Sequence, residues 1–237
     1  MPSDQLHSIV EANLNKVRDR IANACAAASR DPDTVQLIGV SKYVGPTETA
    51  ALVAAGCDVL GEARPQQLWS KTEAAELAQA EIQWRLIGHL QRNKAERTVA
   101  VASSIDSVDS QRLLTAIDRA ASNQAEPQPV LLEVNVSGDA EKHGFSPAEL
   151  PNVIGELDRW PNVEVRGLMA MASREGGQET ARLNFAQLRG LSDKLSTAEL
   201  PLQELSMGMS GDLEAAIAEG STLVRVGTAL WEGVDRI

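Results

Sequence analysis

The chain has 237 residues, 43% of them hydrophobic and 23% charged, and its formal net charge is −11. This length and composition are typical of one globular domain with a sizeable core, and they fit a single α/β barrel. Aromatic residues make up only 3%, and together with the negative charge this argues against nucleic-acid binding, since phosphate backbones would be repelled.

No apolar run approaches the roughly 20 residues that a membrane span needs. The first four residues carry no signal-peptide pattern, so we expect a cytoplasmic protein without membrane contact. The two cysteines show no metal-binding spacing and are interpreted as reduced structural thiols. The three histidines are scattered along the sequence, so we expect no metal site.

In chain order, a long amphipathic helix over residues 5–29 precedes an alternation of short β-branched segments and Ala/Leu/Glu-rich segments. We expect the following order: strand 35–42, helix 46–55, strand 58–62, helix 64–80, strand 83–88, helix 94–100, strand 104–108, helix 110–123, strand 130–136, helix 146–159, strand 164–169, helix 179–195, strand 204–209, helix 211–219 and strand 223–226. The stretches 123–129 and 173–178 are predicted to be exposed loops.

Strands that alternate with helices pair in parallel, and eight of them favour closure. We therefore predict a single (β/α)8 TIM-type barrel over residues 1–237, with an extra N-terminal helix. Chemistry in such barrels takes place at the carboxyl ends of the strands. The residues expected at that rim include Lys42, Asn135, Met169, Met209, Ser210, Gly227 and Thr228.

Lys42 ends an apolar strand, where partial desolvation lowers the pKa of an amine and makes it a nucleophile toward an aldehyde. The alternative is a rim lysine that merely extends into solvent. From its position alone, both interpretations stay open.

Ser210-Gly211-Asp212 opens a helix after the seventh strand, and Gly227-Thr228 closes the eighth. Free N–H groups at a helix start, with hydroxyls beside them, suit a phosphate, and these two loops form the usual phosphate site of the architecture. Capping of the helix by Ser210 or Asp212 is the alternative. Two such features in adjacent loops favour the phosphate.

Arg225 lies between two valines in the last strand and needs a partner. It can pair with a strand carboxylate such as Glu133 or Glu62, or face a ring nitrogen of a ligand. The loop at Lys142-His143-Gly144 can close over the mouth of the barrel or form a simple turn. The pattern decides neither question.

Several segments together resemble the family of pyridoxal 5′-phosphate (PLP) homeostasis proteins. The matching segments are Ile38–Lys42, Ile87–Lys94, Lys142–Gly144, Gly167–Met169, Leu205–Ser210 and Val224–Leu230. They occur in the family's order and spacing from the first strand to the last.

The resemblance implies a barrel like the N-terminal domain of alanine racemase. It implies PLP as cofactor, held as a Schiff base on Lys42, with phosphate contacts at Ser210, Gly227 and Thr228 and with Arg225 near the pyridine nitrogen. We include Asn135, Met169 and Met209 among the expected cofactor-binding residues. Two positions depart from the family pattern: Ala63 replaces a usual Asn, and Gly211 precedes Asp212.

We expect a PLP carrier that serves intracellular PLP homeostasis, with apo PLP enzymes as partners, and a monomer. An amino-acid racemase is the alternative, and a Schiff-base aldolase without cofactor fits the motifs poorly. Two-base racemisation needs a second proton donor opposite the lysine, and the single tyrosine, Tyr43, adjoins Lys42. An arginine at the ring nitrogen also weakens PLP as an electron sink. We therefore expect no catalytic residue.

Overall fold

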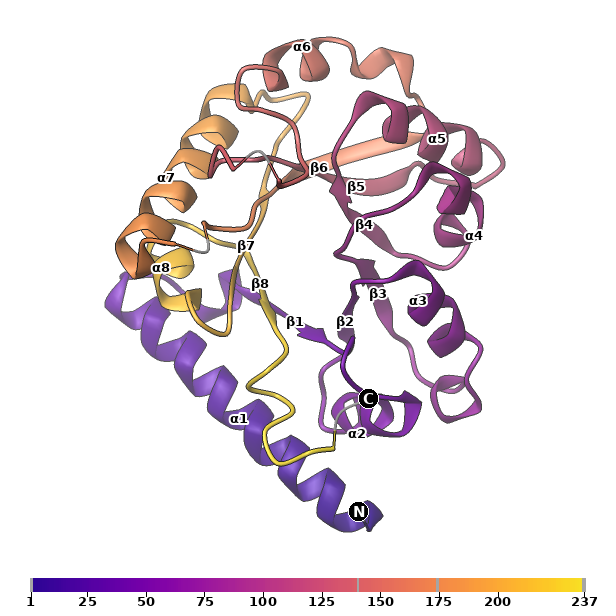
Figure 1. Cartoon of the computed structure of the whole chain (residues 1–237), viewed down its shortest axis with the longest axis vertical. Helices are drawn as coiled ribbons and strands as arrows, with labels where there is room; N and C mark the ends of the chain where they lie inside the picture. Colours follow the sequence, from indigo (N-terminus) through magenta and orange to yellow (C-terminus); the bar gives the residue numbers. More distant parts are fainter. Residues whose placement is uncertain (1, 140, 174, 236–237) are drawn as a thin grey trace.

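The strands of this barrel are short and most of their residues are buried, as expected of parallel strands that are covered on both faces. The computed structural model describes residues 2–139, 141–173 and 175–235. Within them, eight parallel strands close into a barrel in sequence order, β8 pairing with β1 (Figure 1). They are β1 (Gln36–Val40), β2 (Val59–Glu62), β3 (Gln83–Leu86), β4 (Ser104–Val108), β5 (Gln128–Glu133), β6 (Val163–Met169), β7 (Glu204–Met209) and β8 (Leu223–Val226).

The helices form a ring outside the strands (Figure 1). They are α1 (Ser3–Ala27), α2 (Pro46–Ala54), α3 (Pro65–Thr72), α4 (Ala95–Val99), α5 (Gln111–Ala121), α6 (Leu150–Gly155), α7 (Gly177–Leu195) and α8 (Leu213–Ala218). The predicted barrel and its extra N-terminal helix are thereby confirmed. Helix α1 contacts both α2 and α8 and so covers the place where the barrel closes. No helix in the described ranges is long and apolar enough to cross a membrane.

Two predicted helices are shorter than expected. Residues 64–80 divide into α3 and a 3-10 turn at Ala75–Leu77. Helix α6 begins at Leu150 and not at Ser146, because Pro151 has no N–H and is tolerated only in the first helical turn. Ser146 instead forms a turn in which its N–H and Oγ donate to Glu149 Oε2, each at 2.7 Å.

Other boundaries moved as well. Strand β1 ends two residues before Lys42, which lies in a turn. Strand β5 begins at Gln128, so the predicted loop 123–129 was too long, although residues 123–127 are exposed as expected. Of the predicted loop 173–178, Arg174 lies outside the described residues; 175–178 are exposed as expected, but residues 177 and 178 already belong to α7.

The barrel interior has an apolar layer and a polar one. Its apolar part is a separate cluster drawn from five strands: Ile38, Val59, Leu131, Met169 and Leu223. Because side chains alternate along a strand, Arg225 faces the same side as Leu223, whereas Glu62 faces the helices. This parity decides which charged groups can meet.

Candidate functional site

The carboxyl ends of β6, β7, β8 and β1 lie side by side around the barrel and form one arc of its rim. Lys42, Met169, Ser210 and Thr228 follow or end these four strands. Because all the strands are parallel, the predicted residues are brought to the same end of the barrel. Asn135 follows β5, the next strand along the rim.

Lys42 occupies a turn directly after β1 and is half-buried. Its Nζ lies 4.9 Å from the centre of the Tyr43 ring. No hydrogen bond or ion pair joins that Nζ to another of the described residues, whereas Lys142 Nζ donates to Ser137 Oγ at 3.1 Å and Ala172 O at 2.9 Å. The amino group of Lys42 is therefore held near the rim without being neutralised by a carboxylate.

The backbone that carries Lys42 is fixed from behind by a buried ion pair. Lys71, on α3, pairs with Glu62 at the end of β2, and their side chains are 6% and 0% exposed. Lys71 Nζ also donates to the carbonyl oxygen of Ser41 at 2.7 Å, and Ser41 Oγ donates to Glu62 Oε1 at 2.8 Å. Burial lowers the pKa of Lys71, which the attraction of Glu62 opposes. Lys71 thus supplies a hydrogen-bond partner for the carbonyl of Ser41, which lies just beyond the end of β1.

A second donor holds the preceding residue. The indole Nε1 of Trp231 donates to Val40 O at 2.7 Å, and Trp231 is fully buried. Gly227 lies against the same place, since a Cβ there would come within 3.2 Å of Val40 Cβ. The end of β1 is consequently anchored on both sides, from α3 and from the segment after β8.

The turn after β7 leaves backbone donors unused. Its carbonyl oxygens are engaged from outside the turn: Arg20 Nη2 donates to Ser210 O at 3.1 Å, and Gln178 Nε2 donates to Gly211 O. The N–H groups of Ser210 and Gly211 have no acceptor among the residues described. Asp212 does not cap α8 with its side chain but accepts from Met209 N–H at 2.6 Å. Two free N–H groups with a hydroxyl beside them suit an anion.

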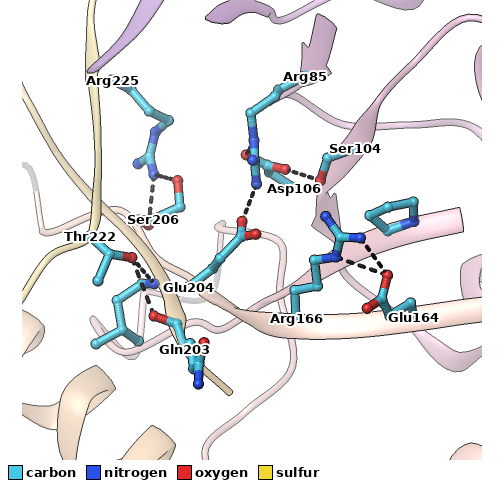
Figure 2. A network of polar contacts seen from close by, with 12 residues as sticks. Arg85, Ser104, Asp106, Glu164, Arg166, Gln203, Glu204, Ser206, Thr222 and Arg225 are labelled. Carbon is cyan, nitrogen blue, oxygen red and sulfur yellow. Dashed lines mark hydrogen bonds and ion pairs between the residues drawn. The ribbon is translucent and has the colours of Figure 1, made fainter. Parts of the chain in front are cut away.

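Arg225 is buried and ties three strands together (Figure 2). Its Nη1 donates to Ser206 O and Oγ, both at 2.7 Å, and its Nη2 donates to Ala170 O at 3.0 Å. Burial lowers the pKa of Arg225, and the charges of Asp106, Asp212 and Glu133 counter this effect. No carboxylate of the described part of the chain lies within ion-pair distance, so the ion-pair alternative with Glu133 or Glu62 was wrong.

A neighbouring network fills the polar layer inside the barrel (Figure 2). Arg85 Nε pairs with Asp106 at 2.8 Å and Arg85 Nη2 with Glu204 at 2.6 Å, while Ser104 Oγ donates to Asp106 at 2.6 Å. Burial lowers the pKa of Arg85, but the two carboxylates outweigh it and raise the pKa above its usual value. The network fixes β3, β4 and β7 beneath the rim.

The remaining predicted residues differ in their exposure to solvent. Met169 is buried in the barrel interior, and Met209 is 40% exposed at the end of β7. Asn135 is half-buried, and its amide is engaged by its own loop, donating to Asp139 O at 2.7 Å and accepting from Ser137 Oγ at 3.1 Å. In this structure Asn135 therefore organises a loop of the rim.

The sequence matches the family model described as alanine racemase, N-terminal domain, over residues 12–234. A pyridoxal phosphate homeostasis protein of Pseudomonas aeruginosa is 40% identical, with 96% of this chain and 97% of that protein covered. The chain belongs to the pyridoxal phosphate homeostasis protein family. A further family member from Aquifex aeolicus is 38% identical over 92% of this chain and 95% of its own length.

Two solved structures have the same fold as this homeostasis-family chain. PipY of Synechococcus elongatus, solved with PLP bound, superposes with a TM-score of 0.77 at 36% identity, covering 89% of this chain and 99% of PipY. An alanine racemase of Clostridium difficile has a TM-score of 0.73 at 18% identity and covers 94% of this chain but 56% of the racemase. That second likeness shows a shared barrel only. The curated relatives are named for homeostasis and not for a reaction.

Sequence reasoning about this homeostasis-family chain missed two features. The Lys71–Glu62 pair was not expected, although Pro65 opening a helix directly after β2 was a signal that α3 would pack against that strand end. The three histidines were treated as scattered, yet His89 and His143 stack with ring centres 4.4 Å apart. Both follow strand ends, and the rim rule applied to β3 and β5 would have brought their loops together.

Proposed function

We propose that this chain binds PLP through a Schiff base on Lys42 and serves intracellular PLP supply. The observation that carries the proposal is the unpaired amino group of Lys42 on a rigidly anchored strand end. An amine that is neither hydrogen-bonded nor ion-paired within the described part of the chain needs no partner displaced before it attacks an aldehyde. PipY, which is 36% identical and was solved with PLP bound, supports the same cofactor.

The other residues fit the remaining parts of the cofactor. The N–H groups of Ser210 and Gly211 have no acceptor among the described residues, and together with the hydroxyls of Ser210 and Thr228 they are the donors that we assign to the phosphate. Arg225 keeps its Nε without an acceptor among the described residues, and this N–H is the donor we assign to the ring nitrogen. Met169 and Met209 supply apolar contacts at the ends of β6 and β7.

When bound, PLP supplies a reactive aldehyde and an electron-withdrawing ring. Arg225 donates a hydrogen bond and so opposes protonation of the ring nitrogen, which weakens electron withdrawal. Lys42 remains competent to form and exchange an imine. These residues therefore favour holding and releasing the cofactor over chemistry at an amino acid, and we infer apo PLP enzymes as recipients, a cytoplasmic location and a monomeric state.

The test is an absorbance spectrum of the purified chain with PLP, before and after borohydride, followed by peptide mass analysis. We expect a band near the edge of the visible range that becomes irreversible, with the added mass on Lys42. Mass on another lysine would overturn the assignment.

A second measurement separates carrier from racemase. Solvent deuterium incorporation at Cα across a panel of amino acids should stay far below the roughly 1–10³ per second of ordinary enzymes. Exchange within that range would establish catalysis and require a second base. Transfer of PLP to an apo enzyme, followed by recovery of that enzyme's activity, checks the carrier role directly.

A further inference from the structure

Three side chains of types that can ligate a metal converge on the rim opposite β8, and the proposed PLP site uses none of them. His89 follows β3, Asp109 follows β4, and His143 lies in the loop after β5. His89 Nδ1 lies 2.9 Å and His143 Nδ1 lies 3.7 Å from the same oxygen, Asp109 Oδ2. One potential ligand atom from each residue lies within 4.8 Å of the others.

Hydrogen bonds within the rim hold the loops that carry these groups in place. Ser107 Oγ donates to Gly88 O at 2.7 Å, directly before His89. Ser110 Oγ donates to Asp109 Oδ1 at 3.0 Å, which leaves the other carboxylate oxygen toward the two rings. Such a donor to the second oxygen is how proteins orient a ligating carboxylate.

His143 is placed by the glycine that follows it. Gly144 has a φ of +114°, and a Cβ there would come within 2.9 Å of Asn135 N. The close approach lets Phe145 N–H donate to Glu133 O at 2.8 Å and Asn135 N–H donate to Phe145 O at 2.9 Å. The loop is thereby attached to the end of β5, with His143 beside Asp109.

The spacing matches an ion with few protein ligands. For metal–ligand bonds of about 2.1 Å, neighbouring ligand atoms in a tetrahedral site are about 3.4 Å apart. The two separations from Asp109 Oδ2, 2.9 and 3.7 Å, lie on either side of that value, and a bound metal would replace the hydrogen bond that now joins His89 to Asp109. Two imidazoles and one carboxylate are a donor set for zinc-like ions, whereas Mg²⁺ and Ca²⁺ prefer oxygen ligands.

We propose that His89, Asp109 and His143 bind one divalent transition-metal ion of the zinc class. Three protein ligands leave at least one coordination position open. A hollow of about 540 Å³ adjoins His89 and Asp109, and Arg92 and Arg112 are among the residues that line it. The open position therefore accepts water or a small anion.

The experiment is a titration of the untagged chain with Co²⁺ and Zn²⁺ near neutral pH. Cobalt bound by imidazole gives visible absorption bands, and the bound metal per chain gives the stoichiometry. We expect one equivalent of metal, displacement of Co²⁺ by Zn²⁺, and no displacement by excess Mg²⁺. His89→Ala, Asp109→Asn and His143→Ala should each weaken binding at least about tenfold.

The third histidine provides the matched control, because His7 lies on α1, far along the chain from the cluster. His7→Ala should bind within about twofold of the parent chain, since it removes no ligand. His143 is 61% exposed, so its replacement leaves the core intact, and His143→Gln with a circular dichroism spectrum checks this. Failure of the parent chain to bind, or equal losses in His7→Ala and His143→Ala, would overturn the proposal.

Discussion

The two sides of the end of β1 treat a lysine in opposite ways. On the rim, Lys42 is half-buried and contacts the ring of Tyr43, with no ion pair or hydrogen bond to its Nζ within the described ranges. Behind the strand, Lys71 is almost fully buried, pairs with Glu62 and donates to the backbone of Ser41. One lysine is left with its amine available, and the other has its charge fully committed.

The surroundings of each lysine, and not its residue type, separate the two roles. A buried charge must be paired, so Lys71 can only be structural. Because it binds the carbonyl of the residue directly before Lys42, it also sets where the available amine stands. The position of the Lys42 amine therefore depends on Lys71.

The largest effect is expected at Lys42 itself. Lys42→Ala should abolish the borohydride-trappable PLP while leaving the circular dichroism spectrum unchanged, because its side chain contacts a ring at the rim and no core partner. Some PLP should remain bound without a covalent bond, since the phosphate donors are separate. Lys94→Ala, a lysine after β3, is the control and should keep the trapped cofactor. If Lys42→Ala still gave the full amount of borohydride-trapped PLP, the distinction between the two lysines would be lost.

Lys71→Met should cost about 3–5 kcal/mol of unfolding free energy, because it leaves Glu62 as a buried, unpaired charge. Urea denaturation of the PLP-free chain measures this loss. The double variant Lys71→Met/Glu62→Leu should recover much of it, since both charges are then gone. A loss of less than 1 kcal/mol in the single variant would show that the pair is not needed to hold the strand end.

The next effect concerns the proposed phosphate donors, Ser210 and Thr228, which lie at the same rim as Lys42. A hydrogen bond to a charged acceptor contributes roughly 1.5–3 kcal/mol, so Ser210→Ala with Thr228→Val should weaken PLP binding by well over tenfold. Equilibrium dialysis with PLP and with pyridoxal, which lacks the phosphate, measures the effect. If pyridoxal binds the parent chain as tightly as PLP does, the phosphate lies elsewhere.

The smallest effect concerns solvent access to the side of β1 that faces the helices. Cys57 is buried behind β1, where a Cβ on Gly39 would meet its sulfur at 2.9 Å, and burial raises its pKa to about 11. A thiol with a raised pKa stays protonated, so we expect almost no reaction with a disulfide reagent at pH 8 until the chain unfolds. Between pH 9 and 11 the Cys57 thiol ionises in the unfolded chain but not yet in the folded one, so the free energy of unfolding should fall as the pH rises. Cys57→Ser should lack that decline, and fast labelling of the native chain would show that this side is open to solvent.

The barrel could be predicted from sequence because its strands are short segments with apolar residues, separated by segments with helical periodicity. The ends of elements were harder, since Pro151 fixes a helix start that composition alone obscures. Glu62 was wrong as an alternative partner of Arg225, because the sequence pattern did not show which face of its strand each side chain occupies. Arg225 faces the interior together with Leu223, while Glu62 faces α3. The rim residues themselves could be found, because the strand-end rule selects them in any barrel of this kind. What remained out of reach were contacts between loops distant in sequence, such as the stacking of His89 on His143.

The pairing of β1 with β8 has a consequence for the newborn chain. Gln36 of β1 pairs with Leu223 of β8, so the first strand of the barrel to be synthesised waits for the last one. At ordinary rates of synthesis, that wait is roughly 10–40 s. During it, β1 presents an unpaired edge that other chains can join, because only closure removes the edges of a barrel. The barrel therefore closes only once β8 has been synthesised, and until then β1 stays available for pairing with other chains.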